Sequence, residues 1–91
     1  MQILENKTAL ITGGSKGIGY GIAAALMAQG MKVAITSRSQ ANANEAAAEL
    51  NKIGKGEAIG IKADVRDFSS QTHAVEVVMK KWGRLDLLVA N

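Results

Sequence analysis

A chain of 91 residues with no cysteine and a net charge of +3 is long enough for one small domain. Its hydrophobic content of 47% indicates a folded core, and the missing cysteines exclude disulfides and thiolate metal sites. The small net charge does not by itself argue for nucleic acid. Because no apolar run of about 18 residues and no signal-peptide pattern is present, we expect no membrane span and a cytoplasmic protein.

Strand-like and helix-like segments alternate along the first half of the chain. The apolar run Thr8–Thr12 predicts a strand, and apolar residues at helical spacing from near Ile18 predict a helix that Gly30 ends. The β-branched run Lys32–Ser37 predicts a second strand. An apolar stripe over Ala43–Ile53 then predicts a second helix.

The second half continues the alternation. Residues Glu57–Ala63 are expected to form a third strand. Asp67 or Ser69 is expected to cap a third helix that Gly83 ends, and Asp86–Ala90 is expected to form a fourth strand. Continuous apolar strands joined by helices are typical of a parallel sheet covered on both faces. We therefore predict an α/β fold, a doubly wound parallel sheet of the Rossmann type with strand order 3-2-1-4.

The fourth predicted strand would lie near the middle of such a sheet. Its apolar residues 87–89 would otherwise be an aggregation-prone edge. We therefore expect residues 1–91 to be the first part of a single nucleotide-binding domain, with the rest of that domain beyond Asn91.

The segment Gly13-Gly14-Ser15-Lys16-Gly17-Ile18-Gly19 joins the first strand to the first helix. Glycines let a backbone approach an anion closely, and the first N–H groups and the dipole of the helix favour phosphate there. Residues 6–44 contain no Asp or Glu, which favours an anion at this loop.

This segment matches neither of two other kinds of phosphate loop. A Walker loop requires Lys and Ser or Thr after its last glycine, but Tyr20 and Gly21 follow Gly19. The fingerprint Gly-x-Gly-x-x-Gly is absent from the turn. Its looser form, which begins at Gly19, lies inside the helix, and we interpret it as packing. The remaining pattern is Gly13-x-x-x-Gly17-x-Gly19. In it, we expect Gly13 to make the turn, Gly17 to admit a pyrophosphate and Gly19 to let the helix approach the strand.

This loop resembles the nucleotide motif of the short-chain dehydrogenases/reductases, and two further segments resemble that family at matching places. Asp64-Val65, after the third strand, is similar to the family's pair beside the adenine. Leu88–Asn91 resembles the start of its Asn-Asn-Ala-Gly motif, with Ala90 in place of the first Asn. The resemblance covers all 91 residues.

The choice between NAD and NADP depends on the end of the second strand. NAD sites place a carboxylate there for the ribose hydroxyls, whereas this chain has Ser37 and Arg38. The planar guanidinium of Arg38 can pair with a 2′-phosphate, Lys16 adds a second cation, and the hydroxyls of Ser15 and Ser37 can donate. We therefore predict NADP(H). The predicted cofactor-binding residues are Gly13, Ser15, Lys16, Gly17, Ile18, Gly19, Ser37, Arg38, Asp64, Val65 and Asn91.

The resemblance implies an oxidoreductase that moves hydride between nicotinamide and a small carbonyl or alcohol substrate, with 3-oxoacyl-acyl-carrier-protein reductases as one subgroup. It also implies a homodimer or homotetramer. The family's catalytic Ser, Tyr, Lys and Asn would lie beyond Asn91, so none is assigned here and the chain alone is expected to be inactive. Tyr20 is not the family's catalytic tyrosine, because Ala24 stands where its lysine would be. His73 has no partner at metal-ligand spacing, and no metal site is predicted.

Two other functions remain for a sheet of this type. A protein that binds NADP without catalysis would lack Ser and Tyr-x-x-x-Lys in the remainder of its sequence. A Rossmann-like methyltransferase would favour an acidic residue after the second strand, and Arg38 argues against it.

Overall fold

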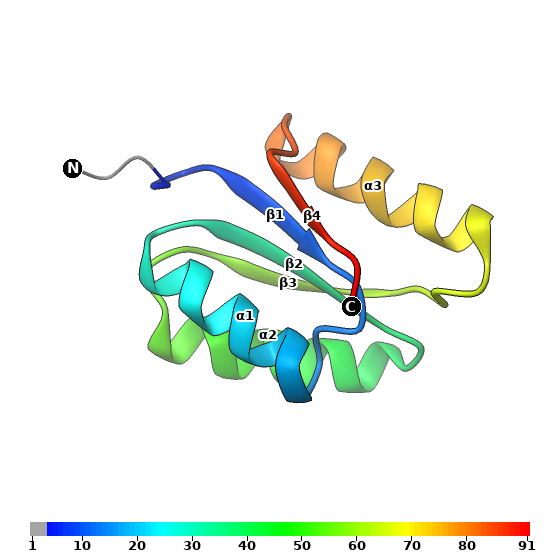
Figure 1. Cartoon of the computed structure of the whole chain (residues 1–91), viewed down its shortest axis with the longest axis horizontal. Helices are drawn as coiled ribbons and strands as arrows, with labels where there is room; N and C mark the ends of the chain where they lie inside the picture. The colour runs from blue at the N-terminus through cyan, green and yellow to red at the C-terminus, as the bar shows by residue number, and fades with distance from the viewer. Residues whose placement is uncertain (1–3) are drawn as a thin grey trace.

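The computed structural model describes residues 4–91 and confirms the alternation of strands and helices (Figure 1). The elements in chain order are β1 (Thr8–Ile11), α1 (Gly17–Ala28), β2 (Lys32–Ser37), α2 (Gln40–Ile53), β3 (Ala58–Lys62), α3 (Phe68–Trp82) and β4 (Leu87–Val89). None of these helices is long and apolar enough to cross a membrane.

The strands form one parallel sheet in the order β3-β2-β1-β4, which confirms the predicted order. In the register, Leu10 of β1 lies opposite Ala34 of β2 and Leu88 of β4. Because all strands run the same way, the loops after β1, β2, β3 and β4 meet at one edge of the sheet. This carboxyl edge is where all three sequence motifs end.

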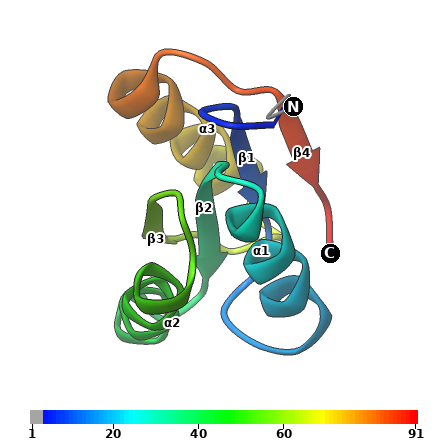
Figure 2. The same ribbon diagram turned by 90° about the vertical axis from the view of Figure 1, so that its left-hand side faces the viewer.

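The two faces of the sheet are covered differently. Helices α1 and α2 lie on one face and α3 lies on the other (Figures 1 and 2). Ile11 and Ile35 point into the core under α1 and α2, whereas Leu10 belongs to the core under α3. Alternation along a strand therefore fills both cores with aliphatic side chains. At the end of the sheet, Leu87 and Leu88 of β4 are 40% and 56% exposed.

The start of α2 and the length of β4 differ from those expected. Helix α2 begins at Gln40, three residues before the apolar stripe, because the Ser39 hydroxyl caps it by accepting from Asn42 N at 3.2 Å. For α3, the first of the two expected caps is confirmed, since Asp67 accepts from Ser69 N at 3.0 Å. Strand β4 is shorter than residues 86–90, because at each end a side chain replaces a backbone partner in the ladder.

Those side-chain partners fix β4 against β1. At its start, Asp86 Oδ2 accepts from Thr8 N at 2.9 Å, and the Arg84 guanidinium donates to both carboxylate oxygens at 2.8 and 2.7 Å. At its end, Asn91 N donates to the Thr12 hydroxyl at 3.1 Å. The Arg84 guanidinium and the Thr8 amide lower the pKa of Asp86 from 3.8 to about 2.

The core under α1 and α2 provides a test of the fold. Leu50 is fully buried in α2, so Leu50→Ala should lower the free energy of unfolding by about 2–5 kcal/mol. The matched control is Ile53→Ala in the same helix, where the side chain is 67% exposed and the expected change is within about 0.5 kcal/mol. Urea unfolding measures both, and equal losses would contradict this core assignment.

The low pKa of Asp86 predicts a pH dependence of stability. Because folding favours the ionised carboxylate, its contribution is complete above the ordinary pKa of 3.8 and is lost as the pH falls through about 2. Asp86→Asn should therefore be less stable than the parent at neutral pH and lose less stability between about pH 4 and pH 2. Urea unfolding across this range measures the effect, and an unchanged slope in the variant would argue against it.

Candidate functional site

An open groove of about 710 Å³ lies at the carboxyl edge of the sheet. It receives residues from the loops after β1, β2 and β3 and from the end of β4. The predicted residues that line it are Gly13, Ser15, Lys16, Ser37, Arg38, Asp64, Val65 and Asn91. The other three, Gly17, Ile18 and Gly19, form the start of α1. The fold thus brings together side chains from four separate segments of the sequence.

The loop between β1 and α1 crosses the end of β2. Gly13 and Gly17 both have left-handed backbone angles, with φ of +68° and +66°, which favour glycine. Gly13 N donates to the Thr36 hydroxyl at 3.1 Å, and Gly14 N donates to the Thr36 carbonyl at 3.1 Å. Thr36 is fully buried and therefore holds the turn from beneath.

Asn91 holds the same loop from the other side. Its backbone N donates to the Thr12 hydroxyl, and its side-chain Nδ2 donates to the Gly13 carbonyl at 3.2 Å. A Cβ on Gly19 would lie 2.8 Å from both Asn91 Nδ2 and the Gly13 carbonyl oxygen. Gly19 is therefore needed for close approach to the loop and to the residue after β4, rather than to a strand as expected.

We expected the looser glycine fingerprint that begins at Gly19 to serve packing, and this interpretation is wrong at Gly21. This residue lies inside α1, as expected, but it is exposed and a Cβ there would meet nothing within 4 Å. Gly14 is the tightly packed position instead, since a Cβ there would lie 2.7 Å from Ile35 Cγ2. Helical position alone did not show which side of α1 faces the sheet.

The first turn of α1 is suited to an anion. Lys16 is its N-cap residue, no side chain caps the turn, and no acidic residue lies in it. The N–H groups of this turn and the positive end of the helix dipole therefore favour a negative group. A Cβ on Gly17 would meet nothing within 4 Å, so the space before this turn is open.

The groove is lined by three cationic side chains, Lys16, Arg38 and Arg66, and by one carboxylate, Asp64. Arg66 binds that carboxylate through its Nε at 3.1 Å, its Nη2 at 3.0 Å and its backbone N at 2.9 Å. These hydrogen bonds lower the pKa of Asp64 to about 2, with a smaller contribution from the charge of Arg38. The groove is therefore positively charged overall.

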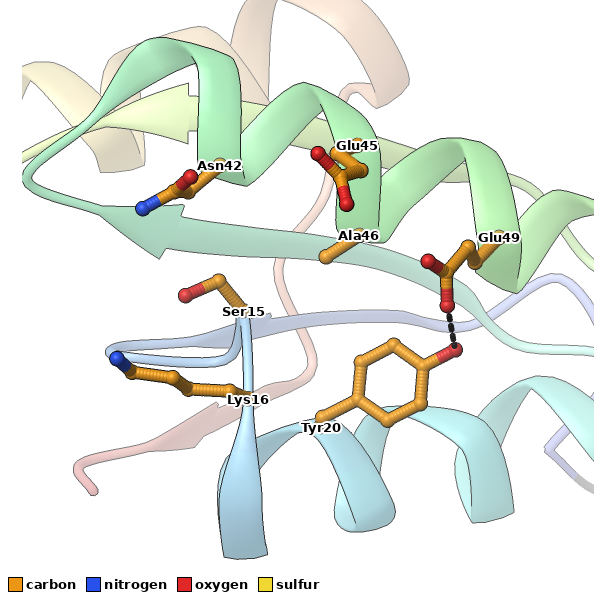
Figure 3. Close-up of a pocket in the computed structure, with 7 residues that line it drawn as sticks. All are labelled: Ser15, Lys16, Tyr20, Asn42, Glu45, Ala46 and Glu49. Atoms are coloured by element: carbon orange, nitrogen blue, oxygen red, sulfur yellow. Dashed lines mark hydrogen bonds between the residues drawn. The ribbon is translucent and has the colours of Figure 1, made fainter.

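A smaller pocket of about 260 Å³ continues from the groove between α1 and α2. In Figure 3, Tyr20 points toward Glu49 across it, while Ser15 and Lys16 lie at the end of the pocket near Asn42. The Tyr20 hydroxyl donates to Glu49 at 3.5 Å, and burial and the Glu49 charge raise its pKa. A tyrosine that transfers protons near neutral pH needs a lowered pKa instead, so Tyr20 is unsuited to that role.

The comparisons with known proteins identify this arrangement. Residues 7–91 match the family model for short chain dehydrogenase. The chain belongs to the short-chain dehydrogenase family. Its relatives include the short-chain dehydrogenase/reductase SDRA of Arabidopsis thaliana, which is 38% identical over 97% of this chain and 34% of that protein. Galactitol 2-dehydrogenase of Agrobacterium fabrum is 40% identical over 97% of this chain and 33% of that protein. The chain thus spans about a third of the length of these curated relatives.

Solved short-chain dehydrogenase structures have the same fold. L-sorbose reductase of Gluconobacter frateurii, complexed with NADPH and L-sorbose, superposes with a TM-score of 0.92 and 30% identity over 99% of this chain and 34% of that one. A 3-ketoacyl-(acyl-carrier-protein) reductase of Brucella melitensis, complexed with NADH, superposes with a TM-score of 0.82. It is 36% identical, and the match covers 93% of this chain and 34% of that one. These two relatives hold different nicotinamide cofactors, so the shared fold does not decide between NAD and NADP.

Sequence reasoning missed four residues that line this short-chain dehydrogenase groove and one that supports its glycine loop. The four lining residues are Ser39, Asn42, Ala63 and Arg66, and the supporting residue is Thr36. Arg66 and Asn42 lie in or next to helix-start segments that the sequence motifs do not include. The position of Thr36 at the end of β2, next to the turn after β1, was the one available signal.

The support from Thr36 can be tested with a pair of variants. Thr36→Val keeps the β-branched shape but leaves Gly13 N without its acceptor, so the free energy of unfolding should fall by about 1–3 kcal/mol. Amide hydrogen exchange at Gly13 should also become faster. Thr36→Ser keeps the hydroxyl and should retain the slow exchange, whereas equal exchange in both variants would show that Thr36 does not hold the turn.

Proposed function

We propose that residues 1–91 form the adenosine- and pyrophosphate-binding part of an NADP(H)-dependent oxidoreductase that moves hydride between nicotinamide and a small carbonyl or alcohol substrate. The observation that carries this proposal is the position of Arg38. It follows β2 directly, lines the groove, and has no ion-pair partner among residues 4–91. NAD sites place a carboxylate at this point, which would repel a 2′-phosphate.

The side chains around Arg38 support a phosphate on the ribose. Lys16 lines the same groove from the glycine loop and likewise has no ion-pair partner among the described residues. The Ser37 hydroxyl accepts from Ser39 N at 3.3 Å, which leaves its own hydrogen to donate. Two cations and the hydroxyls of Ser37 and Ser15 are therefore available to one phosphate group.

The rest of the groove fits the remaining parts of the nucleotide. The uncapped first turn of α1, at Gly17, Ile18 and Gly19, suits the pyrophosphate. Asp64 and Val65, after β3, suit the adenine edge. Asn91 keeps the loop around Gly13 in place. When bound, the nicotinamide supplies the hydride, and these residues orient the cofactor.

We infer that proton transfer to the substrate belongs to sequence beyond residue 91, as do the substrate site and the subunit contacts of a homodimer or homotetramer. Tyr20 is not suited to donate this proton, because its hydroxyl is bound to Glu49 and its pKa is raised. This chain alone should then bind nucleotide weakly and show no turnover. A 3-oxoacyl-acyl-carrier-protein reductase is one candidate for the whole enzyme. The cytoplasmic location stays a prediction.

A second candidate is a protein that binds NADP without catalysis, since every residue assigned above holds the nucleotide and none reacts. The sequence that follows Asn91 in the gene distinguishes the two. A Ser followed by Tyr-x-x-x-Lys would support the enzyme, and its absence would favour the binding protein.

Cofactor choice is tested by neutralising the two cations. In the enzyme encoded by the whole gene, Arg38→Gln and Lys16→Gln should each weaken NADPH binding by roughly 10- to 100-fold, since each removes a charge-assisted hydrogen bond to phosphate, and should affect NADH much less. Steady-state kinetics or fluorescence titration with both cofactors measures this.

The control for that experiment is Lys32→Gln, which removes the same charge at the amino end of β2, away from the groove. It should leave the ratio of NADPH to NADH affinity unchanged. Equal losses for both cofactors in the Arg38 and Lys16 variants would overturn the assignment of the 2′-phosphate.

A further inference from the structure

The single carboxylate in a groove proposed to bind phosphate requires an explanation. Among the described residues that line the groove, Asp64 alone is acidic. An ionised carboxylate repels a nearby phosphate, and it also attracts the cationic side chains that would bind that phosphate. Asp64 is ionised at neutral pH, since its pKa is about 2.

Arg66 occupies that carboxylate. Two bonds from its guanidinium reach both oxygens, at 3.1 and 3.0 Å, in the bidentate geometry that suits arginine and carboxylate. The Asp64 side chain is 32% exposed and the Arg66 side chain is 72% exposed, so the pair faces the groove and solvent rather than the core. Its net charge is close to zero.

Arg38 lies close enough to Asp64 for its charge to lower the pKa of that carboxyl, yet the two residues form no ion pair. The hydrogen bonds from Arg66 are the largest causes of the lowered pKa, and the charge of Arg38 is the smallest. If the Arg66 guanidinium were absent, Asp64 would present a free carboxylate to Arg38, which has no other ion-pair partner among residues 4–91.

We propose that Arg66 is a specificity-determining residue that acts through Asp64. By binding the carboxylate, it leaves Arg38 free for the 2′-phosphate and removes a negative charge from the groove. This inference rests on the proposed function, because it assumes that Arg38 binds a 2′-phosphate. Arg66 itself is a positioning residue and need not contact the nucleotide.

The loop around Asp64 does not depend on this guanidinium for its shape. Asp64 N donates to the Ser70 hydroxyl at 2.9 Å, and Asp67 N donates to the Asp64 carbonyl at 2.9 Å. The bond from Arg66 N to Asp64 Oδ1 belongs to the backbone and survives a side-chain substitution. Replacing Arg66 therefore removes the charge and leaves the loop folded.

The test uses two probes that differ only in the phosphate of interest, adenosine 2′,5′-bisphosphate and 5′-AMP, titrated into this chain by NMR. In Arg66→Gln, the ratio of their affinities should fall by roughly two- to fivefold toward 5′-AMP, as expected for a partly exposed ion pair. The double variant Asp64→Asn with Arg66→Gln should restore the parent ratio, because no free carboxylate remains. Arg66→Lys should retain most of the ratio.

Arg84→Gln is the matched control. Arg84 binds Asp86 with the same pair of guanidinium bonds, at 2.8 and 2.7 Å, beside the start of β4 at the opposite edge of the sheet. This variant should leave the affinity ratio unchanged.

Three results would overturn the inference. Equal weakening of both probes in Arg66→Gln would make Arg66 only a loop support, an unchanged ratio would remove its role, and failure of the double variant to restore the ratio would exclude action through Asp64. Failure of the proposed function gives a different result. In that case the parent chain does not prefer the bisphosphate, or Arg38→Gln does not lower the ratio, and both proposals fall together.

Discussion

The backbone amides of Gly13 and Gly14 lose their ladder partners where β1 ends, and the rest of the groove depends on how they are satisfied. Buried Thr36 accepts both hydrogen bonds, one with its hydroxyl and one with its carbonyl. The loop must therefore pass over the end of β2, which brings it alongside Ser37 and Arg38. On the other side, Asn91 donates to Thr12 and to Gly13. The position of the glycine loop is thus set by the ends of its two neighbouring strands.

The parallel sheet brings the segments of the candidate site together at one edge, although they are far apart in the sequence. Each strand of the sheet ends in a loop there, and each loop contributes a different kind of group. The first helix contributes free N–H groups and a dipole, β2 contributes Arg38, and β3 contributes Asp64. The single negative group is balanced by Arg66, two residues later. Charge in the groove is therefore controlled within one short loop as well as across the sheet.

Most of the fold could be predicted because it depends on local pattern. Apolar strands, helical stripes and the stop glycines fixed the elements, and the parallel rule then gave the order 3-2-1-4. The features that were missed depend on distant contacts. Gly21 resembled a packing glycine, although only the rotation of α1 shows that it is exposed. The support from Thr36 crosses from one strand to the loop after another, and Arg66 has no motif of its own. The Ser39 cap is a local feature, but it was not predicted because the start of the helix was taken from the apolar stripe, which begins at Ala43.

The unequal covering of the two faces has a consequence for motion. Helices α1 and α2 seal one face with fully buried Ala23, Met27 and Leu50, whereas α3 contributes only Ala74 and Val78 at that depth. Strand β4 has three residues and pairs with β1 alone among the described strands. Within these 91 residues the sheet therefore has a firm layer and a looser one, and local opening of this chain by itself should begin at α3 and β4. Asn91 and Asp64 belong to segments next to the looser layer. In this chain by itself, the wall of the groove at Asp64 should consequently fluctuate more than the wall at Arg38.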